Sequence, residues 1–114
     1  MARRLLFVLV ALASCSAGPE ADLPSISEAR SLAAEWALVN QQAAEGHLTP
    51  AYVKTMRQAV HEQLKTAANA LTEPQSPYGR EIAVLLQEPP DAEPAVLSTH
   101  AEKLKRIEDQ LESA

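Results

Sequence analysis

The chain is poor in the residues that build covalent and phosphate-binding sites. Its 114 residues include one cysteine and three glycines, and 4% of them are aromatic. One cysteine cannot form an intrachain disulfide or a C-x-x-C motif, so the fold has to be held by side-chain packing. Beyond residue 18 the glycines are Gly46 and Gly79, which are too far apart for a glycine-rich loop that cradles phosphate groups.

Two further shortages exclude classes of function. The longest apolar run, residues 5–12, is far shorter than the ~20 residues that cross a bilayer as a helix. Lysine and arginine number 10 against 15 acidic residues, and the formal net charge is −5. This acidic balance argues against nucleic acid as a partner and against adhesion to anionic lipid through a basic patch.

The first residues have the organisation of an export signal. Arg3 and Arg4 precede the apolar run 5–12, and small residues follow it. A basic, an apolar and a small-residue region in this order are typical of a secretory signal peptide. The run ends in Leu12-Ala13-Ser14-Cys15. This ending resembles the lipobox of bacterial lipoproteins, and the resemblance covers the first 15 residues.

The resemblance implies cleavage between Ser14 and Cys15, with residues 1–14 as the signal peptide. It also implies that Cys15 carries a diacylglyceryl group and an amide-linked acyl chain such as palmitate, and two or more chains anchor a protein stably. Ser16, in place of aspartate, implies sorting to the outer membrane, facing the periplasm. Loss of Arg3 and Arg4 changes the net charge from −5 to −7. The alternatives are an uncleaved membrane helix and ordinary cleavage after Ala13 or Ala17.

The mature chain is predicted to be all-α. Residues 15–24 contain Gly18, Pro19 and Pro24, and we expect the lipidated cysteine and a flexible tether there. Apolar residues then recur at helical spacing, which predicts helices at about 26–45, 50–71, 78–87 and 94–112. The expected domain, 25–114, is a small antiparallel bundle of three long helices and one short helix.

Local signals predict where these helices begin and end. Ser25 and Glu28 form a capping box for the first helix, and Gly46 supplies a left-handed residue after it. Thr49 is a suitable N-cap for the second helix, with Pro50 at its first position.

The core is expected to be thin. Leucine, isoleucine, valine and phenylalanine make up 19 of the 100 residues from Cys15 onward. This fraction is close to the ~20% below which a charged chain tends towards disorder. We therefore expect the bundle to gain stability by dimerising or by docking on a partner, and the proline-bounded short helix to be its most mobile part.

No catalytic signature is evident. The sequence has no G-x-S-x-G motif, and His61-Glu62-Gln63-Leu64-Lys65 lacks the second histidine of the zinc-protease motif H-E-x-x-H. One imidazole does not hold a catalytic zinc, which needs three protein ligands. We therefore expect no enzyme activity, no resident metal and no cofactor other than the lipid on Cys15.

Six residues could still serve a site. His61 and His100 are the plausible ligand pair for a metal or haem between helices, with Met56 as a possible axial group. The simpler interpretation places His100 at the bundle boundary, bonded to backbone or to Glu108. Three further candidates have two interpretations each. Trp36 is either a core residue or a ligand platform, Asn40 either fixes the helix register or lies at the solvent edge, and Leu38 is either a lone exposed residue or a partner contact. We expect Tyr52 and Tyr78 at the bundle edge.

Two functional hypotheses follow. The first is a non-enzymatic accessory lipoprotein of the cell envelope that binds another protein or itself, aided by confinement to one leaflet. The second is a helical bundle that binds a small ligand, metal or haem between its helices, which requires His61 and His100 to converge.

Overall fold

A computed structural model describes residues 18–114, and these form helices without any β-strand. The helices are α2 (Pro19–Ala44), α3 (Pro50–Asn69), α4 (Pro77–Gln87) and α5 (Pro94–Ser113). The prediction of an all-α fold with three long helices and one short helix is confirmed. The signal peptide, the cleavage site at Ser14 and the lipidation site at Cys15 lie outside the described residues.

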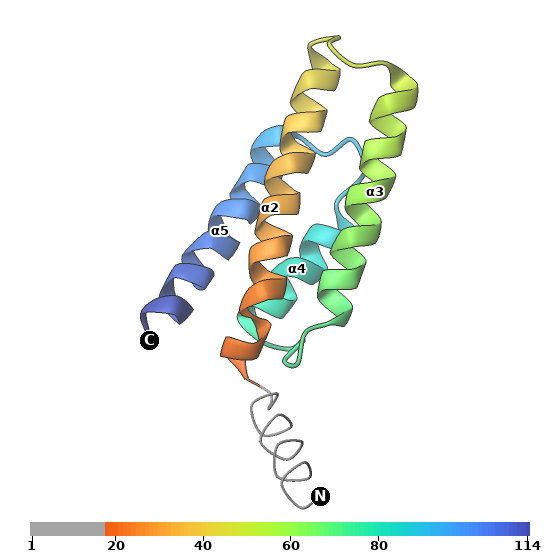
Figure 1. The fold of residues 1–114 in the computed structure, drawn as a ribbon. Helices are drawn as coiled ribbons and strands as arrows, with labels where there is room; N and C mark the ends of the chain where they lie inside the picture. Colours follow the sequence, from red (N-terminus) through yellow and green to blue (C-terminus); the bar gives the residue numbers. More distant parts are fainter. Residues whose placement is uncertain (1–17) are drawn as a thin grey trace, which may run out of the picture.

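Helix α2 is the centre of the bundle. It packs against α3, α4 and α5, whereas α3 and α5 do not contact each other. Both α3 and α5 run antiparallel to α2, and α4 fills the space between them along one half of the molecule only (Figure 1). The bundle is therefore closed at the end near residues 72–76 and less complete towards the turn between α2 and α3.

Helix α2 begins earlier than predicted. It begins at Pro19, so residues 19–24, which were expected in the tether, are helical, and Pro24 lies inside the helix. The capping box at Ser25 and Glu28 is therefore wrong, because both residues lie within the helix. Pro24 removes one backbone hydrogen bond, and the first turns are instead held by a contact of Asp22 with residues some 50 positions away.

The turn between α2 and α3 follows its local signals. Gly46 has φ 75°, its N–H donates to the carbonyl of Ala43 at 3.1 Å, and the N–H of His47 donates to that of Gln42 at 3.0 Å. These bonds form a Schellman motif that satisfies the last carbonyls of α2. Thr49 Oγ1 accepts the N–H of Tyr52 at 3.2 Å. The predicted C-terminal and N-terminal caps are confirmed.

Helix α4 is fixed at its start by close packing. Ser76 caps it, with its hydroxyl accepting the N–H of Gly79 at 3.1 Å. A Cβ atom on Gly79 would lie 2.3 Å from the carbonyl oxygen of Pro74, so the approach requires glycine. Tyr78, which was expected at the edge, is 3% exposed and belongs to the core. Its hydroxyl donates to the buried carboxylate of Asp22, which satisfies this polar group inside the core.

One hydrophobic core joins the four helices. It contains Trp36, as the apolar stripe of α2 predicts, and side chains from every other helix. The largest fully buried apolar residues are Ile26, Val60, Leu64, Ile82, Leu85, Leu97 and Leu104. None of the helices within residues 18–114 has the length and apolarity to cross a membrane.

Candidate binding groove

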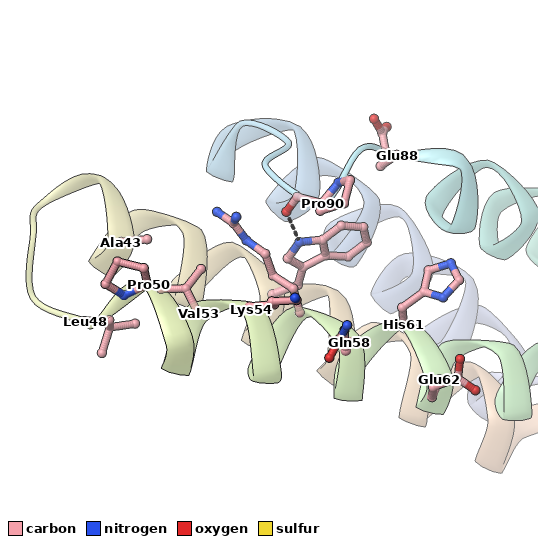
Figure 2. Close-up of a pocket in the computed structure, with 12 residues that line it drawn as sticks. Ala43, Leu48, Pro50, Val53, Lys54, Gln58, His61, Glu62, Glu88 and Pro90 are labelled. Carbon is pink, nitrogen blue, oxygen red and sulfur yellow. Dashed lines mark hydrogen bonds between the residues drawn. The ribbon is translucent and has the colours of Figure 1, made fainter.

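A groove of about 710 Å³ opens on the face where α4 ends. One side is α3, the floor is α2, and the other side is the segment between α4 and α5 (Figure 2). The lining residues are Trp36, Ala43, Leu48, Pro50, Val53, Lys54, Arg57, Gln58, His61, Glu62, Glu88 and Pro90. Within residues 18–114 it is the larger of the two main cavities.

The sequence between α4 and α5 creates this groove. Residues 88–94 contain three prolines, which prevent α4 from continuing, and the chain makes a turn at residues 89–92 before α5 begins. This non-helical segment is narrower than a helix, and α3 and α5 do not meet to close the gap. Part of the surface of α2 and the adjoining face of α3 therefore line a groove beyond the end of α4 (Figure 2).

Hydrogen bonds hold this non-helical segment on α2. Trp36 Nε1 donates to the carbonyl oxygen of Pro90 at 2.9 Å. Asn40 Nδ2 donates to the carbonyl oxygens of Pro90 at 3.1 Å and Ala92 at 2.8 Å. Asn40 is 4% exposed and its Oδ1 accepts from Arg57 Nε at 2.8 Å. Asn40 is thus buried, not at the solvent edge, and it ties α2 to both walls of the groove.

The end of the groove nearer the α2–α3 turn is cationic. Lys54 and Arg57 project from α3 into the lining. Neither forms an ion pair with any carboxylate of residues 18–114. At the opposite end the acidic groups Glu62 and Glu88 already have partners, since Glu62 lies 4.0 Å from Lys65 and Glu88 is bonded to His100. The uncompensated charge in the groove is therefore positive.

His100 is held between two carboxylates. Its Nε2 lies 2.6 Å from Glu88 Oε2, and its Nδ1 contacts the carboxylate of Glu81. Burial disfavours the charged imidazolium, but the hydrogen bonds to Glu81 and Glu88 outweigh that cost and raise the pKa of His100 above its usual 6.5. The cluster joins α5 to the middle of α4, through Glu81, and to its C-terminal end, through Glu88. Sequence reasoning missed these partners, because the Glu81 and Glu88 positions resemble ordinary solvent-exposed sites.

The alternative in which His61 and His100 converge as a ligand pair is not supported by the structure. Both ring nitrogens of His100 are engaged by carboxylates. His61 is exposed on α3, a helix that does not contact α5. Across residues 18–114 no group of three or more His, Cys, Asp or Glu side chains is arranged to hold a metal ion. The predicted partner Glu108 is wrong, since Glu108 instead binds Arg30 at 2.7 Å.

A second polar cluster closes the other end of the bundle. The carboxylate of Asp22, 1% exposed, accepts the hydroxyl of Tyr78 at 2.6 Å and the backbone N–H groups of Thr72 at 2.8 Å and Glu73 at 3.1 Å. Burial alone would raise the pKa of Asp22, but these donors lower it below 3.8. Burial and the neighbouring carboxylate raise the pKa of Tyr78 to about 12. This cluster fixes the start of α2 and contributes nothing to the groove.

Other candidate residues are separated from the groove. Leu38 is 55% exposed on α2, as its position on the charged face predicts. Tyr52 is 51% exposed, which agrees with its expected place at the edge. Neither lines the groove.

Comparison of the chain with models of protein families, with curated proteins and with solved structures gives no match. The fold and the groove therefore define the molecule on their own as an all-α bundle with an open apolar groove.

Proposed function

We propose that this protein is a lipid-anchored, non-enzymatic accessory lipoprotein of the bacterial envelope that binds another protein through its groove. The observation that carries the proposal is the groove beside Trp36, whose floor is apolar and whose walls are fixed by Asn40. A rigid apolar cleft with a few placed polar groups is what a binding site requires.

The anchor and the groove lie at opposite ends of α2. Gly18 is fixed on the bundle, because its N–H donates to Thr72 Oγ1 at 3.2 Å. Cys15 precedes Gly18 by three residues, which span at most ~10 Å. Trp36 and Ala43 lie ~26 and ~36 Å further along the helix, at 1.5 Å per residue. A lipid on Cys15 would therefore hold the end near residues 72–76 at the membrane and leave the groove available to envelope partners.

A small ligand is the second candidate for the groove. Its volume of about 710 Å³ falls within the ~300–1,000 Å³ typical of small-molecule sites. A protein partner is favoured because the groove is continuous with the exposed face of α3 and lies along a helix. We place the site in the periplasm, on the outer membrane, from the lipobox and from Ser16.

Site-specific photo-crosslinking in intact cells tests this proposal. A photoreactive residue replaces Gln58, which lines the groove, or Glu35, which is exposed on α2 outside it, in a C-terminally tagged chain. We expect one envelope protein to be crosslinked from position 58, not from position 35, and to be lost when Cys15→Ser removes the anchor. Equal yields from both positions, or yields that do not depend on Cys15, would contradict a tethered groove binder.

A further inference from the structure

The groove coincides with a missing half of a four-helix bundle. Helix α4 has 11 residues and α3 has 20, so α4 spans ~16 Å beside a neighbour of ~30 Å. The remaining length beside α3 is occupied only by the non-helical residues 88–93, which include a turn. This is the place where the fourth helix of an antiparallel bundle would continue. In Figure 1 the segment that follows α4 runs beside α3 and then crosses to the beginning of α5, and no helix continues α4 there.

The lining of this gap has the length and chemistry of a helix-binding surface. Its residues on α3 extend from Pro50 to Glu62, which corresponds to ~18 Å or about three helical turns. Ala43, Leu48 and Pro50 provide accessible apolar surface along it, beside the nearly buried Val53 and Trp36. An amphipathic helix binds such a groove through apolar residues that recur every three to four positions.

The charges indicate which helix fits. Lys54 and Arg57 lack carboxylate partners among residues 18–114, although the whole chain has a net charge of −5. A partner with carboxylates above these two side chains would compensate them, and the rest of the acidic surface would disfavour other orientations. Lys54 and Arg57 also favour the negative C-terminal end of the bound helix at their end of the groove.

We propose that the groove binds an acidic amphipathic α-helix of about three turns from a partner protein, oriented antiparallel to α3. This inference rests on the proposed function and specifies its partner. The carboxylates of that helix lie in its C-terminal half, over Lys54 and Arg57, and its apolar face covers Val53 and the indole of Trp36.

Two other occupants fit less well. Within residues 18–114, a second copy of the chain has no free helix to offer, since the apolar faces of α2, α3, α4 and α5 are used in its own core. The N-terminal apolar run 5–12 follows Arg3 and Arg4, whose charges would meet Lys54 and Arg57. That run is also attached at Gly18, at the opposite end of α2 from the groove.

Two synthetic 14-residue peptides test the proposal. Both are capped at the ends, lack tryptophan and carry the same leucine stripe at helical spacing. One has glutamates in the C-terminal half of its polar face and the other has lysines at those positions. The full chain is reconstituted in phosphatidylcholine vesicles, and binding is followed by the fluorescence of Trp36, the only tryptophan. Vesicles without protein serve as the blank.

We expect the glutamate peptide to shift the Trp36 emission and to bind at least tenfold more tightly than the lysine peptide. The double variant Lys54→Glu/Gln58→Glu should remove or reverse this preference. Both side chains are exposed and make no hydrogen bond within residues 18–114, so the fold should be retained. Lys103→Glu/Gln110→Glu is the matched control, because it makes the same change of three charge units at exposed sites on α5, outside the groove, and should keep the preference.

Four results would overturn the inference. The first two are equal affinity for the two peptides and no binding of either peptide up to millimolar concentration. The third is an unchanged preference in the double variant. The fourth is tighter binding of sodium dodecanoate than of the glutamate peptide. A concentration-dependent emission shift without peptide would assign the groove to a second copy and would overturn it as well. A position-specific crosslink from position 58 together with any of these results would leave the proposed function intact and reject only the acidic helix.

Discussion

Asn40 of α2 donates hydrogen bonds to the carbonyl oxygens of both Pro90 and Ala92, on a segment some 50 residues later in the chain. Its own oxygen accepts from Arg57 of α3. A single buried amide thereby joins three parts of the bundle and sets the width of the groove.

Replacement of Asn40 should therefore destabilise the protein and loosen the groove. Asn40→Ala leaves the carbonyl oxygen of Ala92 and the Nε–H of Arg57 without their partner, while Pro90 keeps the bond from Trp36. We expect a loss of about 2 kcal/mol in the free energy of unfolding. Urea unfolding followed by circular dichroism measures it. Trp36→Phe, which removes one hydrogen bond to Pro90 but keeps an aromatic ring, should cost less than Asn40→Ala. Amide exchange at residues 88–93 should accelerate in Asn40→Ala, and unchanged exchange would contradict the role of Asn40.

Asp22 should contribute stability that depends on pH. Its folded pKa is lowered below its unfolded value, so the contribution is present above about pH 4 and is lost as the pH falls through the folded pKa. Asp22→Asn keeps the size but has one acceptor oxygen for three donors, and we expect a loss of about 1–3 kcal/mol at pH 7. Urea unfolding at pH 7 and at pH 3 checks this. The difference between the two proteins should shrink at pH 3, and an equal difference at both values would argue against the carboxylate.

His100 should stabilise the fold in the opposite pH range. Its folded pKa is raised, so its contribution is complete below the unfolded value of about 6.5 and is lost as the pH rises through the folded pKa. The melting temperature of the protein should fall across this upper interval, and His100→Gln should flatten that part of the profile. His61→Ala, at an exposed site on α3, is the control that should leave the profile unchanged. If the pH profile of the melting temperature were the same in His100→Gln as in the unmodified protein, the contacts of His100 with Glu81 and Glu88 would not stabilise the fold.

Gly79 should tolerate no larger residue. The methyl group of Gly79→Ala would lie 2.3 Å from the carbonyl oxygen of Pro74, so the turn before α4 has to move. We expect a loss of about 1–3 kcal/mol, the usual cost of overpacking. Ala83→Ser, on an exposed site of the same helix, should change stability by less than about 0.5 kcal/mol. If Gly79→Ala had the same melting temperature as the unmodified protein, the contact with Pro74 would not constrain α4.

The sequence predicts this fold well where the determinants are local. Periodicity locates the four helices, and Gly46 and Thr49 mark ends that the structure confirms. It fails where a polar side chain finds its partner far along the chain. Asp22 extends α2 to Pro19 through Thr72 and Tyr78, and local capping rules place that start at Ser25 instead.

In the candidate site, too, the sequence predicts what is local and not what depends on contacts far along the chain. Trp36 was predicted on the core face of α2, but the groove beside it depends on where the non-helical residues 88–93 lie. Single-sequence periodicity contains no information on that position. The carboxylates around His100 are equally invisible, since Glu81 belongs to α4 and the histidine to α5.

Lipidation of Cys15 is the prediction on which the location of the protein depends. A lipobox cysteine receives its acyl chains through its thiol and, after cleavage, its amine, so Cys15→Ser should abolish both modification and processing. Metabolic labelling with an alkyne analogue of palmitate, followed by gel and mass analysis, should give a labelled mature chain for the unmodified protein and an unlabelled precursor for Cys15→Ser. Ser16→Ala is the matched control, because it alters the neighbouring position and should retain the label. Maturation of Cys15→Ser at a site such as Ala17 would instead assign residues 1–17 to an ordinary secretory signal and leave the groove without an anchor.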